Sequence, residues 1–594
     1  MKNLSILYMI FVLAFLISSC SESFLETKPL TEFSERDVWS DAALAEVYIN
    51  DLYDRIPWGW DMTCLRVDEV RNRSDADDFN HNNMIINPDN AGWGDWNGRY
   101  SSIRACNTFL ENIDKLPVST AIVDGKTVKD RMKGEATFIR ALAYHHLVSY
   151  FGGVPLVKKA YLLTDDFNEP RGSYEDCIKF IADELDLAAG LLPGKNTGAN
   201  VGRVTKGVAL ALKARVLLYA ASDLHNTTHF SGFAHPELLG YTDITATARE
   251  NRWKAAKAAA KAVIDMPQYG LYMPNPASAE EATTNFINLF VTSQNEEDIF
   301  ARFYSANANK GVGQYEIYPC GWYGNGRNGL VNEMVDAFEM ADGTTFSRSN
   351  PAQNLEPYKN RDPRFYGTCI HEGYKLRPRT PDLQAVDPVG VMQAGTWERW
   401  DGSAKILVHG LDSRNSIVNS WNSNLTCTGG RKYLNVATSV STVWDSHWDV
   451  TWRYIRYGEM LLNYAEACIE LGEDGEARTY LNMLRKRAFM PDITESGAAL
   501  KARYRNERRV EMCLEDQRFF DVRRWMIGSN AYHDVHGVSI LYKLNPDNTT
   551  ATIPTITPVV IMTGSWDDKA YFMPISRDEC NKNTTLFQNP GYGM

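Results

Sequence analysis

Amphipathic helical segments that follow one another in pairs dominate the first half of this chain. Helical patterns over about 128–151 and 205–221 are each followed by a second helix, and the helix centres fall near 140, 182, 213 and 258. Such spacing is typical of two-helix repeats. One pair cannot bury its apolar face alone, so the pattern predicts tetratricopeptide-like stacking of neighbouring pairs. The fold is therefore expected to be mainly α-helical.

The ends of these helices carry recognisable signals. Ser173 offers a side-chain cap for the helix that follows it. Gly152-Gly153 and Pro193-Gly194 are expected to stop helices, because glycine is favoured just past a helix end and proline cannot continue one. Further helices are predicted at about 36–56, 99–115 and 252–266.

A block of 185 residues, 267–451, interrupts the helical pattern. It is rich in Gly, Asn, Trp and Tyr, and it contains one clear helical pattern, near 330–339. A segment of this length is too long to be a loop without structure of its own. It is therefore predicted to be an insertion of irregular turns and short strands. Helices are expected again at about 453–471, 475–489 and 498–516, before a tail of loops and short strands from Gly528.

The first twenty residues have the layout of a removable export signal. A small positive start at Met1–Asn3 precedes an apolar run, Leu4–Ile17, that is short for a membrane helix. Cys20 follows small residues, which resembles the bacterial lipobox, in which the new N-terminal cysteine is acylated after cleavage. This implies a signal peptide over 1–19 and a lipidated tether over 20–35. An ordinary signal peptide with a chance cysteine is the alternative.

One domain is expected over 36–594, with helix pairs over about 36–266 and 453–525 on either side of the insertion. No apolar stretch after the signal reaches the length of a membrane helix. Loss of Lys2 with the signal leaves 61 basic against 74 acidic residues, a formal charge of −13. A surface of this charge disfavours nucleic acid and other polyanions as bulk partners.

The motifs typical of enzymes are absent or out of context. The sequence has no GxSxG and no HExxH, and the nine cysteines after Cys20 form neither a CxxC pair nor a cluster with zinc spacing. The GNGRNG run at 324–329 follows no predicted strand, so a dinucleotide site is not expected there. No cofactor is expected, and the pairing of cysteines in disulfides stays open.

Many aromatic residues lie in Gly/Asn-rich segments rather than in periodic ones. Trp93 and Trp96 lie in NAGWGDWNGR, and Trp322 and Tyr323 directly precede the GNGRNG run. Core aromatics should follow helix or strand periodicity. Aromatics on loops are better placed to present a flat face to a ligand, although packing between loops is the alternative reading.

Several segments, taken together and in order, resemble the SusD/RagB family of Bacteroidota outer-membrane nutrient-binding lipoproteins. They span nearly the whole chain after the signal, and only the usual Asn-Pro near 583 is missing. The segments are Cys20 with Phe24-Leu25-Glu26 and Asp41-Ala42, EATFIRALAYHHLVSYFGGVPLV (135–157), GRVTKGVALALKARVLLYAAS (202–222), LVNEMVDAFEMADG (330–343), YKNRDPRF (358–365), RYIRYGEMLLNYAEACIELG (453–472), LNMLRKRAFMP (481–491), ERRVEMCLEDQRFFDVRRW (507–525) and MPISRDECNKN with FQNPGY (573–592).

The resemblance implies a specific fold, location and partner. Family members carry four tetratricopeptide-like helix pairs on one side and an irregular ligand-binding region on the other. They perform no chemistry, most of their known ligands are glycans, and they cover a SusC-like, TonB-dependent outer-membrane transporter. The chain is accordingly expected to be lipid-anchored in the outer membrane at the cell surface and to deliver oligosaccharide to such a transporter.

The resemblance also suggests where a sugar would bind. In family members with known sugar sites, aromatics from an early loop and from the middle insertion form the platform. This implies Trp96 and Asn97 together with Trp322 and Tyr323, with Trp93 as a further candidate. Sugar rings have apolar C–H faces that stack on flat aromatics, and asparagine can take the hydroxyls.

Asp68 and Arg71 lie in a charged stretch and could supply further hydrogen bonds to hydroxyls. The alternatives are a solvated acidic loop, since charge runs are usually on the surface, or a structural calcium site built from carboxylate oxygens. The spacing does not match an EF-hand.

Two other functions stay open from the sequence. One is a glycoside hydrolase of the same uptake system, because 74 acidic residues leave many possible carboxylate pairs. The other is a non-catalytic helical-repeat protein for adhesion or scaffolding that has no small ligand. Which glycan is bound, or whether the ligand is a peptide, does not follow from the sequence.

Overall fold

The structure is a computed structural model that describes residues 39–57, 63–71, 80–117, 122–162, 164–165, 167–304, 317–326, 329–418, 422–437 and 450–593. The predicted signal peptide, the tether and the acylated Cys20 lie outside the described residues. None of the helices within these ranges is both long enough and apolar enough to cross a bilayer. The nine cysteines within them are all free thiols.

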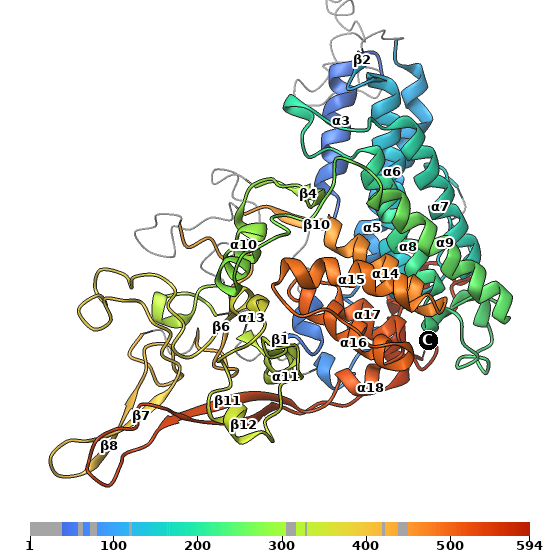
Figure 1. Cartoon of the computed structure of the whole chain (residues 1–594). Helices are drawn as coiled ribbons and strands as arrows, with labels where there is room; N and C mark the ends of the chain where they lie inside the picture. The colour runs from blue at the N-terminus through green and yellow to red at the C-terminus, as the bar shows by residue number, and fades with distance from the viewer. Residues whose placement is uncertain are drawn as a thin grey trace, which may run out of the picture.

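Antiparallel helices packed one against the next form the body of the molecule (Figure 1). α6 packs on α7, α7 on α8 and α8 on α9, while α3 and α5 cover α6. We call this group, together with α14–α16 below, the helical stack. Its first helices are α3 (Ala42–Asp54), α5 (Trp96–Asn112), α6 (Val128–Phe151), α7 (Tyr174–Leu191), α8 (Lys206–Ala221) and α9 (Ala246–Ile264).

The predicted start and stop signals of these helices are confirmed. The Ser173 hydroxyl accepts a hydrogen bond from Asp176 N at 3.0 Å and so caps α7. α6 ends at Gly152, whose φ is +76°. A β-carbon at Gly153 would lie 2.1 Å from the Gly172 carbonyl oxygen, so only glycine allows the chain to turn here.

The second half of the stack comes from the C-terminal part of the chain. α9 packs directly on α14, and α14 packs on α15 and α16. The segment between α9 and α14 therefore leaves the stack and returns to it. β4, within this segment, pairs antiparallel with β10, which directly precedes α14. These elements are β4 (Asp298–Arg302), β10 (Trp452–Arg456), α14 (Tyr457–Glu470), α15 (Asp474–Arg487), α16 (Gly497–Glu511), α17 (Arg518–Arg524) and α18 (Gly528–Ala531).

The insertion is irregular, as predicted, but it contains more helix than the sequence indicated. The predicted helix near 330–339 is α11 (Asn332–Ala337). α10 (Ala279–Val291) was not predicted, although Ser278 caps it by accepting from Glu281 N at 3.1 Å. The helix expected from 453 begins only at Tyr457, because the preceding residues form β10. The short helices are α12 (Pro351–Leu355), α13 (Pro363–Thr368) and, near the C-terminus, α19 (Arg577–Lys582).

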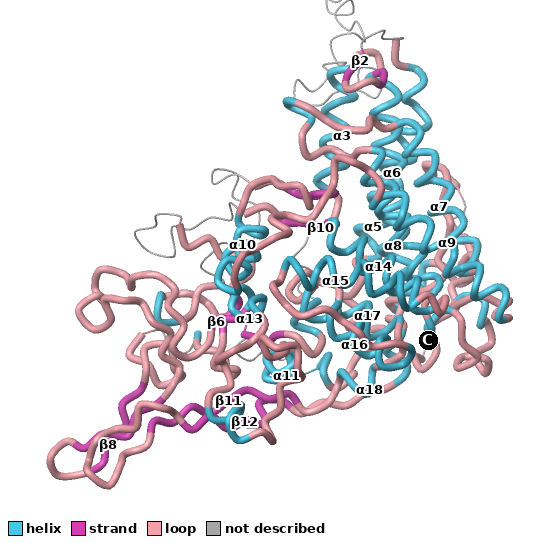
Figure 2. Tube along the Cα trace, viewed as in Figure 1, coloured by secondary structure: helices cyan, strands magenta, loops and turns pink. Residues whose placement is uncertain are grey.

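A narrow sheet of four strands projects from the insertion (Figures 1 and 2). The strand order is β12-β11-β7-β8, with β11 parallel to β7 and the other pairs antiparallel. Glu372 ties the sheet to the insertion by accepting from Ala394 N at 2.7 Å and from the Tyr542 hydroxyl at 2.9 Å. The strands are β7 (Thr396–Trp400), β8 (Lys405–His409), β11 (Val535–Tyr542) and β12 (Thr555–Met562). Two-residue strands pair as β1 (Val70–Arg71) with β5 (Gly329–Leu330), β2 (Ile122–Val123) with β3 (Lys126–Thr127) and β6 (Cys369–Ile370) with β9 (Gly429–Gly430).

The two largest apolar cores among the described residues lie one inside the stack and one inside the insertion. Buried ion pairs connect the two parts. Arg364 of α13 pairs with Glu507 and Glu511 of α16 at 2.5 and 3.0 Å. Arg456 pairs with Glu511 at 2.9 Å and with Glu297 at 3.1 Å. We call this connected set the junction network; its members are Arg364, Lys432, Arg456, Arg485, Arg487, Arg503, Glu297, Glu339, Asp362, Glu495, Glu507, Glu511 and Glu515.

Candidate functional site

Two of the predicted platform tryptophans are buried. Trp93 is 4 % exposed and lies between Phe519, stacked at 5.4 Å, and the Arg66 guanidinium, 3.9 Å from the ring centre. Trp322 is 1 % exposed, and the Arg379 guanidinium lies 3.5 Å from its ring centre. Both rings thus pack inside the protein, which was the alternative interpretation of these aromatics. Their burial does not support a role as a ligand platform.

Asp68 and Arg71 are also buried, which corrects the expectation of a solvated loop. Asp68 pairs with Arg509 and Arg518, each at 2.9 Å. Burial raises the pKa of this carboxyl, but the two guanidinium groups outweigh burial and hold the pKa well below its usual range. Arg71 donates to Val70 O at 2.8 Å and to the Asn82 side chain at 2.8 Å. Both side chains brace the protein interior.

The other predicted residues lie near the surface but apart from one another. Asn97 is exposed on the first turn of α5. Tyr323 is half-buried with φ +62°, and its hydroxyl donates to Asp382, a hydrogen bond that raises the pKa of the phenol to about 12. Neither of them lines a cavity described below. Trp96 does, and it leads to the candidate site.

Trp96 lines a groove of about 480 Å³ between three segments that are far apart in sequence. A volume of this size is typical of small-molecule sites. We call it the aromatic groove. It is lined by Trp96, Tyr100, Arg104, Pro155, Val157, Lys159, Tyr161, Phe167, Glu169, Glu579, Lys582, Asn583 and Leu586.

The first wall is one face of α5. Trp96, Tyr100 and Arg104 are spaced by four residues, so they lie above one another on the helix. Asp95 fixes the start of this helix by accepting from Gly98 N at 3.2 Å. The Trp96 ring is held by Tyr100 at 5.0 Å and, edge to face, by Phe151 at 5.1 Å. The indole is half-buried, so part of it faces the groove.

The second wall is the extended segment 155–161. Alternate residues of an extended chain point the same way, and Pro155, Val157, Lys159 and Tyr161 all line the groove. Tyr144 holds this segment by donating to Val157 O at 2.8 Å. Tyr161 and its neighbours in this segment were not predicted as site residues, although their alternation is visible in the sequence.

An exposed phenyl ring and the C-terminal segment close the groove. Phe167 is 51 % exposed and meets the Tyr161 ring edge to face at 5.5 Å. The Tyr161 hydroxyl donates to the Glu169 carboxylate, and the Asn583 side chain donates to Glu169 O at 2.7 Å. Charged side chains of both signs line the rim. Two of them, Lys582 and Glu579, pair at 2.6 Å. Aromatic faces flanked by hydrogen-bonding groups can hold a polyhydroxylated ring.

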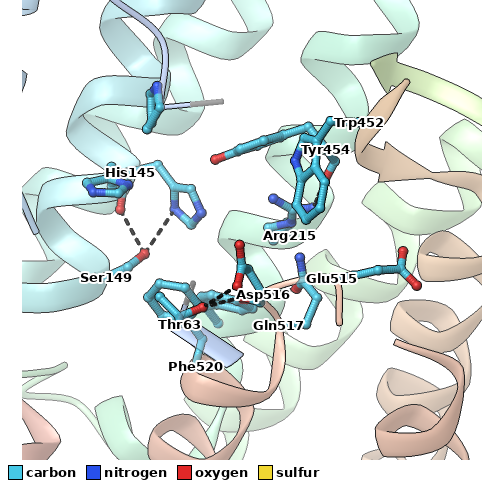
Figure 3. A pocket seen from close by; sticks show the side chains of 13 residues that line it. Thr63, His145, Ser149, Arg215, Trp452, Tyr454, Glu515, Asp516, Gln517 and Phe520 are labelled. Carbon is cyan, nitrogen blue, oxygen red and sulfur yellow. Dashed lines mark hydrogen bonds between the residues drawn. The ribbon is translucent and has the colours of Figure 1, made fainter. Parts of the chain in front are cut away.

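A second cavity is buried, polar and much smaller (Figure 3). It encloses about 60 Å³ beside Ser149, His145 and Asp516. This is room for a few waters, whereas a dry cavity of about 150 Å³ is needed to take a benzene-sized ring. Burial lowers the pKa of His145 to about 3, so the imidazole is neutral at physiological pH. Asp516 accepts from the Thr63 hydroxyl at 3.0 Å. A sugar ring does not fit here.

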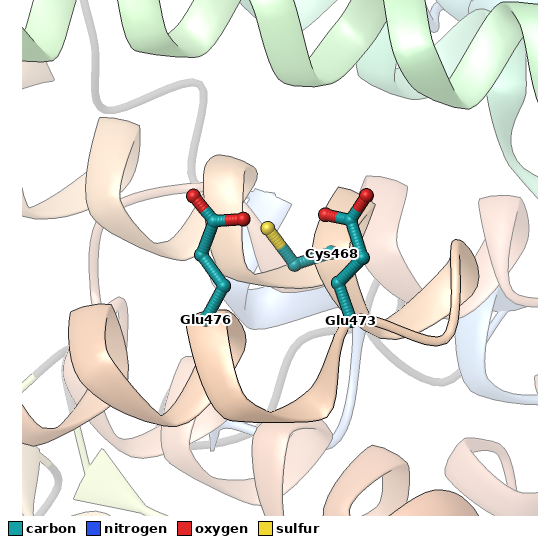
Figure 4. Close-up of side chains that lie close together, drawn as sticks. All are labelled: Cys468, Glu473 and Glu476. Atoms are coloured by element: carbon teal, nitrogen blue, oxygen red, sulfur yellow. The ribbon is translucent and has the colours of Figure 1, made fainter.

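One group of acidic and thiol side chains has the spacing of metal ligands (Figure 4). Cys468, Glu473 and Glu476 lie within 4.8 Å of one another. The Lys257 ammonium, however, contacts both carboxylates, at 2.7 Å from Glu476. Burial raises the pKa of the Cys468 thiol to about 12, so without a metal this thiol is protonated at neutral pH. A lysine thus takes the place that a cation would occupy.

Comparisons with known proteins place the chain in a family. A family model described as "SusD family" matches residues 289–592, which is just over half of the chain. A second model, described as "Starch-binding associating with outer membrane", matches residues 23–218. SusD-like protein P38 of Formosa agariphila is 23 % identical over 545 residues, covering 88 % of this chain and 91 % of the relative.

Solved structures share the fold. A SusD-like protein from Bacteroides fragilis is 27 % identical and has a TM-score of 0.72, covering 95 % of this chain and 100 % of that protein. Surface glycan-binding protein A from Bacteroides thetaiotaomicron, solved with laminarihexaose, is 18 % identical with a TM-score of 0.58, covering 92 % and 98 %. The predicted mainly helical fold with an irregular insertion is confirmed. The chain belongs to the SusD family of non-catalytic, outer-membrane-associated glycan-binding proteins.

Proposed function

We propose that this protein captures an oligosaccharide in the aromatic groove at the cell surface and delivers it to a SusC-like, TonB-dependent transporter. The observation that carries the proposal is the groove itself: it has the volume of a ligand site and is lined by Trp96, Tyr100, Tyr161 and Phe167. The starch-binding description of the matching family model and the laminarihexaose complex of the Bacteroides thetaiotaomicron protein support a glycan as the ligand.

The chemistry of the groove suits a neutral glycan. The apolar C–H face of a sugar ring can stack on the exposed Phe167 ring or on the half-buried Trp96 ring. Lys159, Asn583 and Glu169 can bind hydroxyls from the rim. Positive and negative side chains alternate there, and the net charge of −13 after loss of the signal disfavours a polyanion. An open groove stays wet, so affinity is expected to be modest, as hand-over to a transporter requires.

The experiment compares two groove variants with a matched control. Trp96→Ala and Phe167→Ala each remove an aromatic face of the groove, while Phe489→Ala removes a ring of similar exposure, 47 %, that does not line it. Burying one aromatic face against a sugar contributes about 1–3 kcal/mol at about 25 cal/mol per Å². Each groove variant should therefore bind roughly ten- to a hundredfold more weakly.

Isothermal titration with maltohexaose and laminarihexaose, preceded by a glycan array on the purified chain, measures this effect. The unfolding transition of each variant is recorded first, so that loss of binding is not confused with loss of fold. Parent-like affinity in both groove variants would place the site elsewhere. Reducing ends released by the purified chain would instead favour a hydrolase.

Anchoring and partnership are tested separately. Acylation of Cys20 is proposed to hold the protein in the outer membrane, since several acyl chains anchor stably where one anchors marginally. Cys20→Ala should move the protein to the soluble fraction, and membrane retention of that variant without a partner would count against lipidation. A large β-barrel protein should co-purify from native membranes; repeated recovery of the chain alone would argue for a free-standing receptor.

A further inference from the structure

A second groove, of about 300 Å³, opens where the helical stack meets the insertion. Its walls come from the connection between α7 and α8, the connection after α9, and the turn between α10 and β4. Pockets at the meeting of two structural units are common ligand sites. We call it the amide groove, because four amide side chains line it, together with two cations and two carboxylates whose charges balance. The amides are Asn196, Gln268, Gln294 and Asn295, and the charged residues are Lys195, Arg203, Glu296 and Asp298.

An apolar surface lies at one side of this groove. Phe303, directly after β4, is 37 % exposed, and its ring packs on Gly202. A β-carbon at Gly202 would come within 3.0 Å of that ring, and the residue has φ +93°, so glycine is required for this close approach. Val201, 41 % exposed, lies beside it. The groove thus offers one aromatic face within reach of several amides.

The amide groups divide into those that shape the groove and those left for a ligand. Asn295 is used in the fold: its side chain donates to Leu289 O and accepts from Glu297 N, each at 3.0 Å. Gln294 is exposed, and the structure gives its side-chain amide no hydrogen bond within the described residues.

Asn196 also belongs to the group that shapes the groove. Its side chain is fixed by donating from Nδ2 to Arg203 O at 2.9 Å and to Val204 O at 3.3 Å. Both bonds require the amide nitrogen, so Oδ1 is necessarily the acceptor end. Asn196 is only 8 % exposed, and among the described residues its Oδ1 is buried without a hydrogen-bond partner. This oxygen has less than 1 Å² of accessible surface, so a ligand in the groove does not reach it, and Asn196 shapes the wall of the groove.

We infer that the amide groove is a second carbohydrate-binding site, which takes a neutral sugar unit. The ring would stack on Phe303, and the exposed Gln294 amide would bind its hydroxyls. Neutral amides can both donate to and accept from hydroxyls, which suits uncharged, polyhydroxylated ligands better than anions or peptides with charged ends. This inference rests on the proposed function, since it assigns the same class of ligand to another part of the surface.

The test uses a reporter inside the groove. The full chain is labelled with fluorophenylalanine, and the Phe303 and Phe167 signals are assigned by their loss in Phe303→Leu and Phe167→Leu variants. Maltohexaose, laminarihexaose and any glycan found by the array are titrated while fluorine spectra are recorded. A bound sugar should shift the Phe303 signal, and the shift should persist in Trp96→Ala, whose aromatic groove is impaired.

Two further variants define the site. Gln294→Ala should weaken the binding read from the Phe303 signal at least tenfold and leave the Phe167 response unchanged, whereas Phe489→Ala should change neither. A Phe303 signal that stays fixed at saturating sugar, while the Phe167 signal moves, would overturn the second site and leave the proposed function standing. Absence of any carbohydrate response, in both signals and on the array, would overturn both.

Discussion

The helical stack and its junction with the insertion are equally buried, but they are held together by opposite kinds of contact. The stack is filled with apolar side chains such as Leu212 and Leu461, both 0 % exposed. The junction network is made of ion pairs, and its Arg364 and Glu511 are 1 % and 0 % exposed. Within the same chain, therefore, one contact depends on shape and the other on charge balance.

The difference matters because the two kinds of contact fail differently. An apolar core loses stability in proportion to the volume removed and the cavity left. A buried ion pair adds little net stability over a well-packed apolar pair, yet removal of one partner leaves a buried charge without compensation. The junction network has six cations and seven carboxylates, so its charges nearly balance and the loss of one member leaves a buried charge without its partner.

Glu511→Ala should therefore be the most damaging change. Glu511 pairs with Arg364 at 3.0 Å, with Arg456 at 2.9 Å and with Arg487. Its loss is expected to lower the free energy of unfolding by about 3–5 kcal/mol. Urea unfolding measures the effect, and Glu511→Gln, which keeps the volume, separates charge from packing. A loss below about 1 kcal/mol would show that the network is not needed to join the two parts.

Leu212→Ala probes the stack in the same experiment. This residue of α8 is fully buried in the apolar core, and its truncation is expected to lower the unfolding free energy by about 2–5 kcal/mol. Leu212→Met nearly conserves volume and should lower it by less than about 1.5 kcal/mol. If the two variants were equally unstable, shape would not be what holds the stack together.

The two regions should also differ in their response to pH. Burial raises the pKa of Glu372, in the insertion, to about 7. Its stabilising contribution is thus complete below about pH 4.5 and is lost as pH rises toward 7. Burial alone would also raise the pKa of Glu466 of α14, but Arg524 and the other partners of this carboxylate lower the pKa to about 2. The stabilising contribution of Glu466 is therefore complete above pH 4.5 and is lost as pH falls toward 2.

Glu372→Gln isolates the first of these effects. The unfolding free energy of the parent should fall by about 1–3 kcal/mol between pH 4.5 and 7, at about 1.4 kcal/mol per pKa unit. The variant lacks the ionisable group, so this fall should be absent. Thermal unfolding across this range provides the measurement, with Glu466→Gln as the control: it should lower stability above pH 4.5 and flatten the acid limb, but keep the fall between pH 4.5 and 7. Parallel pH profiles for parent and Glu372→Gln would contradict the assignment.

Disruption of an exposed ion pair should give the smallest loss of stability among these variants. Lys179 and Asp183 pair at 2.5 Å on α7, and both side chains are more than half exposed. Lys179→Ala should change the unfolding free energy by less than about 0.5 kcal/mol, because solvent and salt screen such pairs. A loss comparable to that of Glu511→Ala would mean that burial is not what makes the junction charges matter.

The stack could be predicted from sequence because its signals are local. The extent of α6, the Ser173 cap and the Gly152 stop all follow from residues within one or two turns. α10 carried comparable signals, Ser278 as a cap and Phe286 spaced from Phe290 by four, and a closer reading would have found it.

Most of the candidate site could not be predicted from the sequence, because the residues that form it are far apart in the chain. Trp322 lies in a Gly/Asn-rich stretch that suggests exposure, but Arg379, 57 positions later, covers its ring. The aromatic groove combines α5, the segment 155–169 and residues near 583. Only Trp96 of the predicted platform lines it, and no local pattern indicates that Tyr161 and Asn583 would meet there.

The direct contact between α9 and α14 has a consequence for folding. α9 ends at Ile264 and α14 begins at Tyr457, so one face of α9 can be covered only after the entire insertion has emerged. Closing such a long intervening segment adds little to the equilibrium cost, about 0.6 kcal/mol for each doubling of length. It does slow folding, because folding rates fall as the contacting residues lie further apart in sequence. The helices α3 to α9 at the start of the stack must therefore wait, with an open apolar edge, for the last quarter of the chain.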